Sequence, residues 1–130
     1  MQTARQETLV APFTFYSGIL NSMKLEEMVP FSSITTFGIG GNARLVLSGG
    51  ADEVREAISF AKDKRNSFIA LGGGSNILGD DGVSDAVFFK LHTAGIDYTK
   101  HGGDVTIVVS AGEKWDEVVS HAVKNGFYGF

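Results

Sequence analysis

One stretch constrains this chain more than any other: IALGGGSNILGDDGVSD, residues 69–85. A short apolar run, which predicts a buried strand, leads directly into the consecutive glycines Gly72–Gly74. Gly79 and the turn-forming segment Asp80–Gly82 then interrupt any regular element. Irregular segments of this length, about 14 residues, are uncommon in compact domains unless they are functional or disordered. Any fold of this chain must therefore accommodate a long glycine-rich loop after a strand.

Two familiar phosphate-binding motifs do not fit this loop. A P-loop needs Lys followed by Ser or Thr after its glycines, and the stretch contains no such pair. A Rossmann fingerprint needs three spaced glycines with a helix beginning inside the motif. Gly72 and Gly74 fit its first two positions, but the third is Ile77, and residues 76–85 cannot form the first turns of a good helix. Binding of phosphate at a helix N-terminus is thus excluded here.

Three interpretations of the loop remain open. The glycines allow successive backbone N–H groups to form an anion-binding concavity, and Ser75 and Asn76 add side-chain donors. The second interpretation is a plain flexible loop. The third is a metal site made by Asp80, Asp81 and Asp85, which is the weakest because these residues lack the spacing of a calcium loop.

The rest of the chain alternates between helical and strand patterns. Apolar spacing predicts helices over residues 13–28 (ended by Pro30), 51–65 and 113–126, and strands over residues 45–47, 67–71, 86–91, 95–99 and 104–112. Gly102 and Gly103 suit a hairpin turn, and Gly126 suits the end of the last helix. Trp115 falls on the apolar face of that helix and is predicted to be a core residue. These elements predict an α/β or α+β chain.

Composition excludes several classes of function. The formal net charge of -4 argues against a nucleic-acid binder that works by bulk electrostatics. The absence of cysteine excludes disulfides, thiolate metal sites and Cys nucleophiles. No apolar run approaches the length of about 20 residues that a membrane helix needs. The three histidines are far apart, so we expect neither a metal site nor a catalytic base among them. Arg44 is interpreted either as a surface-strand charge or as a support for the phosphate loop.

Four blocks in order carry a family resemblance. They are TTFGIGGNARLV (35–46), LGGGSNIL (71–78), DGVSDAVFFKL (81–91) and VSAGEKWDEVVSHAVKNGFYGF (109–130). The set resembles the N-terminal part of the UDP-N-acetylenolpyruvoylglucosamine reductase (UDP-N-acetylmuramate dehydrogenase) family. The resemblance implies an α+β FAD-binding fold with α/β-type subdomains, of the vanillyl-alcohol-oxidase-like (PCMH) type. It divides the chain into an N-terminal extension with a short helix (1–29), a first FAD-binding subdomain (30–92) and the start of a second (93–130).

The resemblance also implies a cofactor and a reaction. The cofactor is FAD, whose pyrophosphate would be held by Gly72, Gly73, Gly74, Ser75 and Asn76, with Ala111 and Gly112 forming another backbone turn near the flavin. NADPH would reduce FAD, and the enolpyruvyl group of UDP-GlcNAc-enolpyruvate would then be reduced to give UDP-MurNAc, in a cytoplasmic step of peptidoglycan synthesis. Binding a pyrophosphate on neutral backbone donors agrees with the net charge of -4.

No catalytic or metal-binding residue of the family can be carried over to this chain. The family's catalytic Ser, Arg and Glu lie beyond the part that residues 30–130 resemble. We therefore expect the chain to be a fragment without reductase activity of its own and with weak or absent FAD binding. Two other functions stay open: a nucleotide- or diphosphate-binding module without redox chemistry, and an inert fragment that self-associates through unpaired strand edges. No nucleic-acid or membrane partner is expected.

Overall fold

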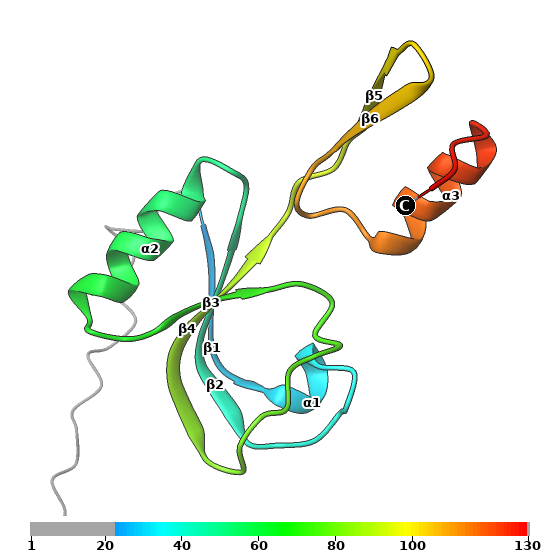
Figure 1. The fold of residues 1–130 in the computed structure, drawn as a ribbon. Helices are drawn as coiled ribbons and strands as arrows, with labels where there is room; N and C mark the ends of the chain where they lie inside the picture. The colour runs from blue at the N-terminus through cyan, green and yellow to red at the C-terminus, as the bar shows by residue number, and fades with distance from the viewer. Residues whose placement is uncertain (1–22, 130) are drawn as a thin grey trace, which may run out of the picture.

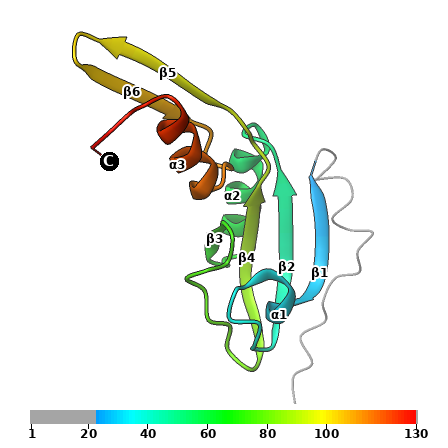
Figure 2. The ribbon, with the colours of Figure 1, turned by 90° about the vertical axis from the view of Figure 1, so that its right-hand side faces the viewer.

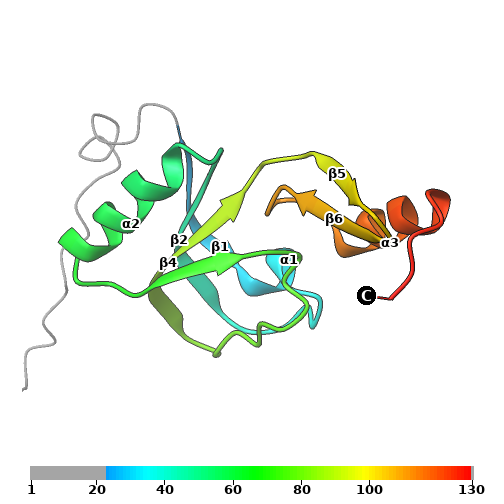
Figure 3. The same cartoon turned by 45° about the horizontal axis from the view of Figure 1, so that its top comes forward.

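The computed structural model describes residues 23–129. In chain order the elements are β1 (Lys24–Pro30), α1 (Phe31–Ile34), β2 (Asn42–Gly49), α2 (Glu53–Asp63), β3 (Phe68–Leu71), β4 (Val83–Leu91), β5 (Ile96–His101), β6 (Asp104–Val109) and α3 (Trp115–Lys124). They form two parts, which Figures 1 and 3 show joined through the segment after β4. The first part is a four-stranded sheet with α1 and α2, and the second is a β5–β6 hairpin with α3.

The four-stranded sheet has the order β1-β2-β4-β3 (Figure 2). β2, β4 and β3 run parallel, whereas β1 pairs with β2 in the antiparallel sense. The two central strands carry near-continuous apolar runs, Leu45–Leu47 and Val87–Phe89, all of which are buried. This is the pattern of strands that are covered on both faces.

Each face of the sheet has its own core. On one face, α2 contributes Ala57, Phe60 and Ala61, which pack with a set from the strands that includes Leu47 and Phe89. On the other face, Phe31 of α1 packs against Phe88 with their ring centroids 5.5 Å apart at an interplanar angle of 76°. Burial of these apolar side chains is the main stabilising term for this part of the chain.

The helix predicted over residues 13–28 is wrong for residues 24–28, which belong to β1; residues 13–22 lie outside the described residues. Leu25 and Val29, four residues apart, fit a helical face. In the structure they pack against opposite faces of the sheet. The alternation is interrupted at Met28, which has a φ of 52°; the pairing with β2 skips Met28 and Arg44 and then continues in the same register. Both strands change face together at this point, because Leu25 and its partner Leu47 belong to one core, whereas Val29 and its partner Ala43 belong to the other.

The other elements predicted from the sequence are confirmed within about four residues at their ends. The hairpin turns at Gly102, which has a φ of 62°, and the last helix ends at Gly126, which has a φ of 67°. The prediction that Trp115 is a core residue is wrong, because 67% of its surface is exposed. No helix among residues 23–129 is both long and apolar enough to cross a membrane.

Candidate functional site

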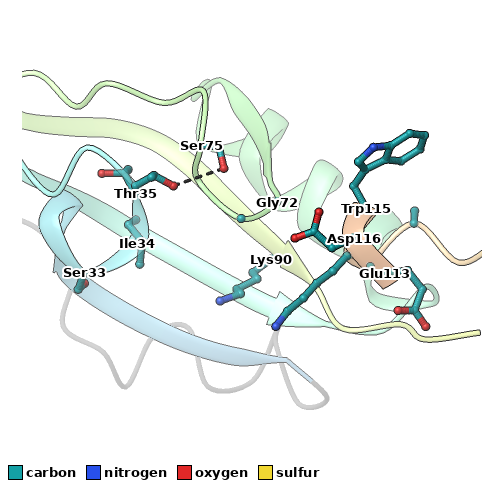
Figure 4. A pocket seen from close by; sticks show the side chains of 14 residues that line it. Ser33, Ile34, Thr35, Gly72, Ser75, Lys90, Glu113, Trp115 and Asp116 are labelled. Atoms are coloured by element: carbon teal, nitrogen blue, oxygen red, sulfur yellow. Dashed lines mark hydrogen bonds between the residues drawn. The ribbon is translucent and has the colours of Figure 1, made fainter. Parts of the chain in front are cut away.

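A cavity of about 630 Å³ lies between the two parts of the molecule (Figure 4). Its walls come from α1 and the residues after it, from the loop after β3, from the end of β4 and from the start of α3. The lining residues are Ser33, Ile34, Thr35, Thr36, Gly72, Gly73, Ser75, Lys90, Ala111, Gly112, Glu113, Lys114, Trp115 and Asp116. The cavity therefore lies at the carboxyl ends of the parallel strands β3 and β4, where open α/β sheets commonly bind ligands.

The glycines of the loop after β3 have two different roles. A Cβ added at Gly72 would meet no atom within 4 Å, and one at Gly73 would meet only the Ser75 hydroxyl at 3.9 Å. Both positions face open space in the cavity. Gly74 instead packs against the segment after α1: it has a φ of 73°, and an added Cβ would lie 2.7 Å from the Thr35 Cα. Gly72 and Gly73 thus leave room for a ligand, whereas Gly74 fixes the loop on the protein.

A second close contact supports the far end of the same loop. The Gly41 N–H donates to the carbonyl oxygen of Asp80 at 2.7 Å, and a Cβ at Gly40 would lie 2.6 Å from the carbonyl oxygen of Gly79. Gly79 itself lies against the Phe31 ring. Two glycine-rich segments therefore pack backbone against backbone. Such close packing, rather than ligand binding, accounts for most glycines in the TTFGIGG and LGDDG stretches.

Five of the seven residues predicted from the resemblance line this cavity, namely Gly72, Gly73, Ser75, Ala111 and Gly112. Gly74 and Asn76 are not among its lining residues. Within residues 23–129, no acceptor is recorded for the backbone N–H groups from Gly73 to Asn76. The Ser75 hydroxyl accepts a hydrogen bond from the Thr36 hydroxyl at 3.3 Å and keeps its own proton to donate. The loop therefore offers several donors to an anion.

The turn that carries Ala111 and Gly112 is held by side chains. The Gly112 N–H donates to the Thr93 hydroxyl at 3.0 Å, and a Cβ at Gly112 would lie 2.5 Å from the Thr93 carbonyl oxygen. The Glu113 carboxylate accepts a hydrogen bond from the Gly95 N–H at 2.7 Å. The Gly112 N–H is thus already used within the protein, so this turn contributes shape to the cavity more than donors.

Sequence reasoning missed several lining residues. Ser33 precedes the TTFGIGG block and Thr35 opens it, and their hydroxyls donate to the carbonyl oxygens of Pro30 and Phe31, respectively, at 2.8 Å. Lys90 and Asp116 come from elements that the sequence predicted without indicating which face each presents. A usable signal for Lys90 was its position after Val87–Phe89, because a charge at the end of a buried strand needs a polar surface nearby.

The metal interpretation finds no support in the geometry. The Asp85 carboxylate pairs with the Arg44 guanidinium across β2 and β4. Asp80 accepts a hydrogen bond from the N–H of Asp81 at 2.8 Å, which is a local turn contact. No group of three or more His, Asp or Glu side chains among residues 23–129 is arranged to hold a metal ion. Arg44 is therefore a strand charge with its own partner, the first of its two interpretations.

Comparison with known proteins assigns the family. The FAD binding domain family matches residues 42–130. The chain belongs to that family. A UDP-N-acetylenolpyruvoylglucosamine reductase from Salinispora arenicola is 37% identical over 101 residues, which cover 75% of this chain and 28% of the relative. The Pseudomonas aeruginosa protein of the same name is 33% identical over 111 residues, which cover 83% and 32%.

The chain spans about a third of these relatives, or less. Among solved structures, a solvent-stable cholesterol oxidase matches with a TM-score of 0.58 and 16% identity, over 80% of this chain and 20% of that protein. This likeness concerns the fold. Together with the family match, it confirms the predicted α+β FAD-binding fold. The family match confirms FAD as the cofactor.

The residues of the cavity fit the diphosphate of FAD. The loop leaves space where side chains would stand at Gly72 and Gly73, and it presents uncommitted N–H groups beside the Ser75 hydroxyl. These are neutral donors of the kind that bind phosphate oxygens in backbone concavities.

Proposed function

We propose that this chain is the FAD-binding portion of an NADPH-dependent UDP-N-acetylenolpyruvoylglucosamine reductase. The reaction is the reduction of UDP-GlcNAc-enolpyruvate to UDP-MurNAc, a cytoplasmic step of peptidoglycan synthesis. The support comes from relatives of that name, such as the 37% identical Salinispora arenicola protein. The 16% identical cholesterol oxidase supports only the fold.

One observation carries the proposal. The glycine loop after β3 and the Ala111–Gly112 turn, 35 or more residues apart in the sequence, line one cavity in a chain of the FAD binding domain family. We propose that Gly72, Gly73 and Ser75 contact the diphosphate. In this proposal Gly74 keeps the loop in place through α1, and Asn76 and Gly112 act by shaping the loop and the turn.

FAD, when bound, supplies the hydride chemistry, and the protein positions it. The chain's own contribution is to hold the diphosphate with backbone donors and to shape the wall of the cavity. We assign no catalytic residue to residues 23–129. We also propose that residues 30–92 form the first FAD-binding subdomain and that residues 93–129 belong to a second, with the cavity at their boundary.

Titration of the purified chain with FAD tests the cofactor site. Trp115 is the only tryptophan of the chain and lines the cavity, so its fluorescence reports occupancy directly. We expect FAD to quench this fluorescence in a saturable manner, with weak affinity. Ser75→Ala should weaken FAD binding about fivefold through the loss of one donor. Ser67→Ala, at the end of β3 opposite the glycine loop, should not change it.

The outcome of the titration also separates the alternatives. If ADP and FAD bind equally tightly, the nucleotide-binding module without redox chemistry is favoured. If neither ligand binds at millimolar concentration, the proposed cofactor site is wrong. The reductase assignment is tested separately by NADPH oxidation in the gene product that carries this chain, which should require the enolpyruvyl substrate.

A further inference from the structure

Lys90 is a charged side chain in the cavity that the glycine motif does not account for. It stands at the end of β4, two residues after Phe88, whose ring packs on α1. Because alternate residues of a strand share a face, Lys90 leaves the sheet on the α1 side. It lines the cavity, and Figure 4 shows its amino group directed into the space bounded by Ile34 and Asp116.

The strand register brings Lys90 beside the glycine loop. In the parallel pairing of β3 and β4, Lys90 is the partner of Leu71, and Gly72 is the next residue. Neighbouring strands lie about 4.8 Å apart. The Lys90 backbone is therefore fixed one strand spacing from the start of the loop. Its ammonium group sits on a flexible four-carbon stem, so it can reach an anion that is bound by the donors of the loop.

Lys90 has no ion-pair partner within the described part of the chain. The salt bridges there are Lys24–Glu26 and Arg44–Asp85. The other charges that line the cavity are Lys114, Glu113 and Asp116, and of these Glu113 already accepts the Gly95 N–H. Figure 4 shows the Asp116 carboxylate turned toward Gly72, so it adds negative charge to the same space. A dianionic diphosphate in this cavity needs a cation to offset that charge.

We propose that Lys90 binds the diphosphate of the cofactor and completes the anion site formed by the loop N–H groups and the Ser75 hydroxyl. The inference rests on the proposed function, because it requires FAD in this cavity. It adds a residue outside the glycine motif and a physical property: cofactor binding depends on salt, since an exposed charge pair is screened as ionic strength rises. Neutral backbone donors alone would give only a weak dependence.

The test compares three variants of the chain by Trp115 fluorescence and calorimetry. Lys90→Met removes the charge and keeps most of the stem, Lys90→Arg restores a charge, and Lys62→Met removes an equal charge from the exposed side of α2. FAD and inorganic pyrophosphate are each titrated at low and high sodium chloride. We expect Lys90→Met to weaken the binding of both ligands by the same factor, about tenfold at low salt. The variant's affinity should also depend less on salt concentration than that of the wild type.

Lys90→Arg should bind within about threefold of the wild type, and Lys62→Met should be unchanged. Equal affinities and equal salt slopes for the wild type and Lys90→Met would overturn the role of Lys90 while leaving the FAD site intact. Weaker FAD binding with unchanged pyrophosphate binding would also overturn it, because Lys90 would then act elsewhere on the cofactor. Failure of the wild type to bind FAD is a different result and contradicts the proposed function itself.

Discussion

The two parts of this molecule bury their apolar residues very differently. The four-stranded part has a packed core on each face of its sheet. In the hairpin–helix part, formed by β5, β6 and α3, the buried side chains are Val118 and Ala122. Several of its large apolar residues are exposed, namely Val108, Val109, Trp115, Val119, Val123 and Tyr128.

This difference indicates that the cavity has one well-packed wall, formed by the four-stranded part, and one weakly held wall, formed by the hairpin–helix part. A sheet covered on both faces buries much apolar surface, whereas a two-stranded hairpin is marginally stable by itself and here depends on its packing against α3. A second groove of about 750 Å³ beside β6 and α3 is lined largely by apolar residues and includes Trp115. A bound ligand or partner should therefore stabilise the hairpin–helix part more than the four-stranded part.

The largest expected effect is the loss of stability caused by a substitution in the core of the four-stranded part. Leu47 is 0% exposed, so Leu47→Ala should lower the free energy of unfolding by about 3–5 kcal/mol. Val118→Ala in α3 removes less buried surface and should cost about 1.5 kcal/mol. Urea denaturation measures both values. Equal costs would contradict the contrast between the two parts.

The next effect separates the two roles of the loop glycines. Gly74→Ala forces a side chain into a residue with a φ of 73° against Ile34 and Thr35, and should destabilise the protein by about 2–3 kcal/mol. Gly72→Ala should leave stability within about 0.5 kcal/mol but weaken FAD binding about tenfold, since its methyl group enters the cavity.

Gly82→Ala is the control for both glycine variants, because a Cβ there also meets open space but lies outside the cavity. It should change neither stability nor FAD affinity. A stable Gly74→Ala variant would show that the loop is not fixed by its contact with α1.

A smaller effect concerns self-association, which stays a prediction. The apolar residues exposed on α3 and the unpaired edge of β6 favour pairing with a second copy. Val123 is 71% exposed, and Val123→Glu should weaken the dimer about tenfold in sedimentation equilibrium. Ile58→Glu on α2, in the well-packed part, should leave it unchanged. A clean monomer for the wild type would contradict the prediction.

The smallest effect tests how the weakly held wall is attached. Glu113→Ala removes the acceptor of the Gly95 N–H and should cost about 0.5–1 kcal/mol. Hydrogen exchange of the Gly95 amide should accelerate about threefold to fivefold. Exchange of the Gly41 amide, which donates to Asp80 in the four-stranded part, should stay the same. Equal acceleration at both amides would indicate global rather than local loosening.

Local patterns were enough to predict most elements of this fold. The α2 and α3 helices have clear apolar stripes, Gly102 marks the turn of the β5–β6 hairpin, and Gly126 marks the end of α3. The sequence could not reveal the change of face at Met28, because this change depends on the pairing of β1 with β2 rather than on local residue preference. The same holds for Trp115: Val118 and Ala122 on the apolar side of its helix are buried, but the covering layer does not extend to Trp115, which is 67% exposed.

Residues of the candidate site could be predicted only where they belong to a recognisable sequence motif. Gly72, Gly73 and Ser75 were recognised from the loop, but the packing role of Gly74 depends on α1, which lies about 40 residues earlier in the chain. Lys90 reaches the cavity through the register of two parallel strands. Neither pairing nor strand order can be read from apolar periodicity alone.

The irregular backbone at Met28 has a consequence for cooperativity. Because it turns Leu25 toward one core and Val29 toward the other, a single edge strand belongs to both. Detaching β1 would expose apolar surface on both faces of the sheet at once. The two cores should therefore open as one unit in native-state exchange, although each has its own helix and its own set of contacts.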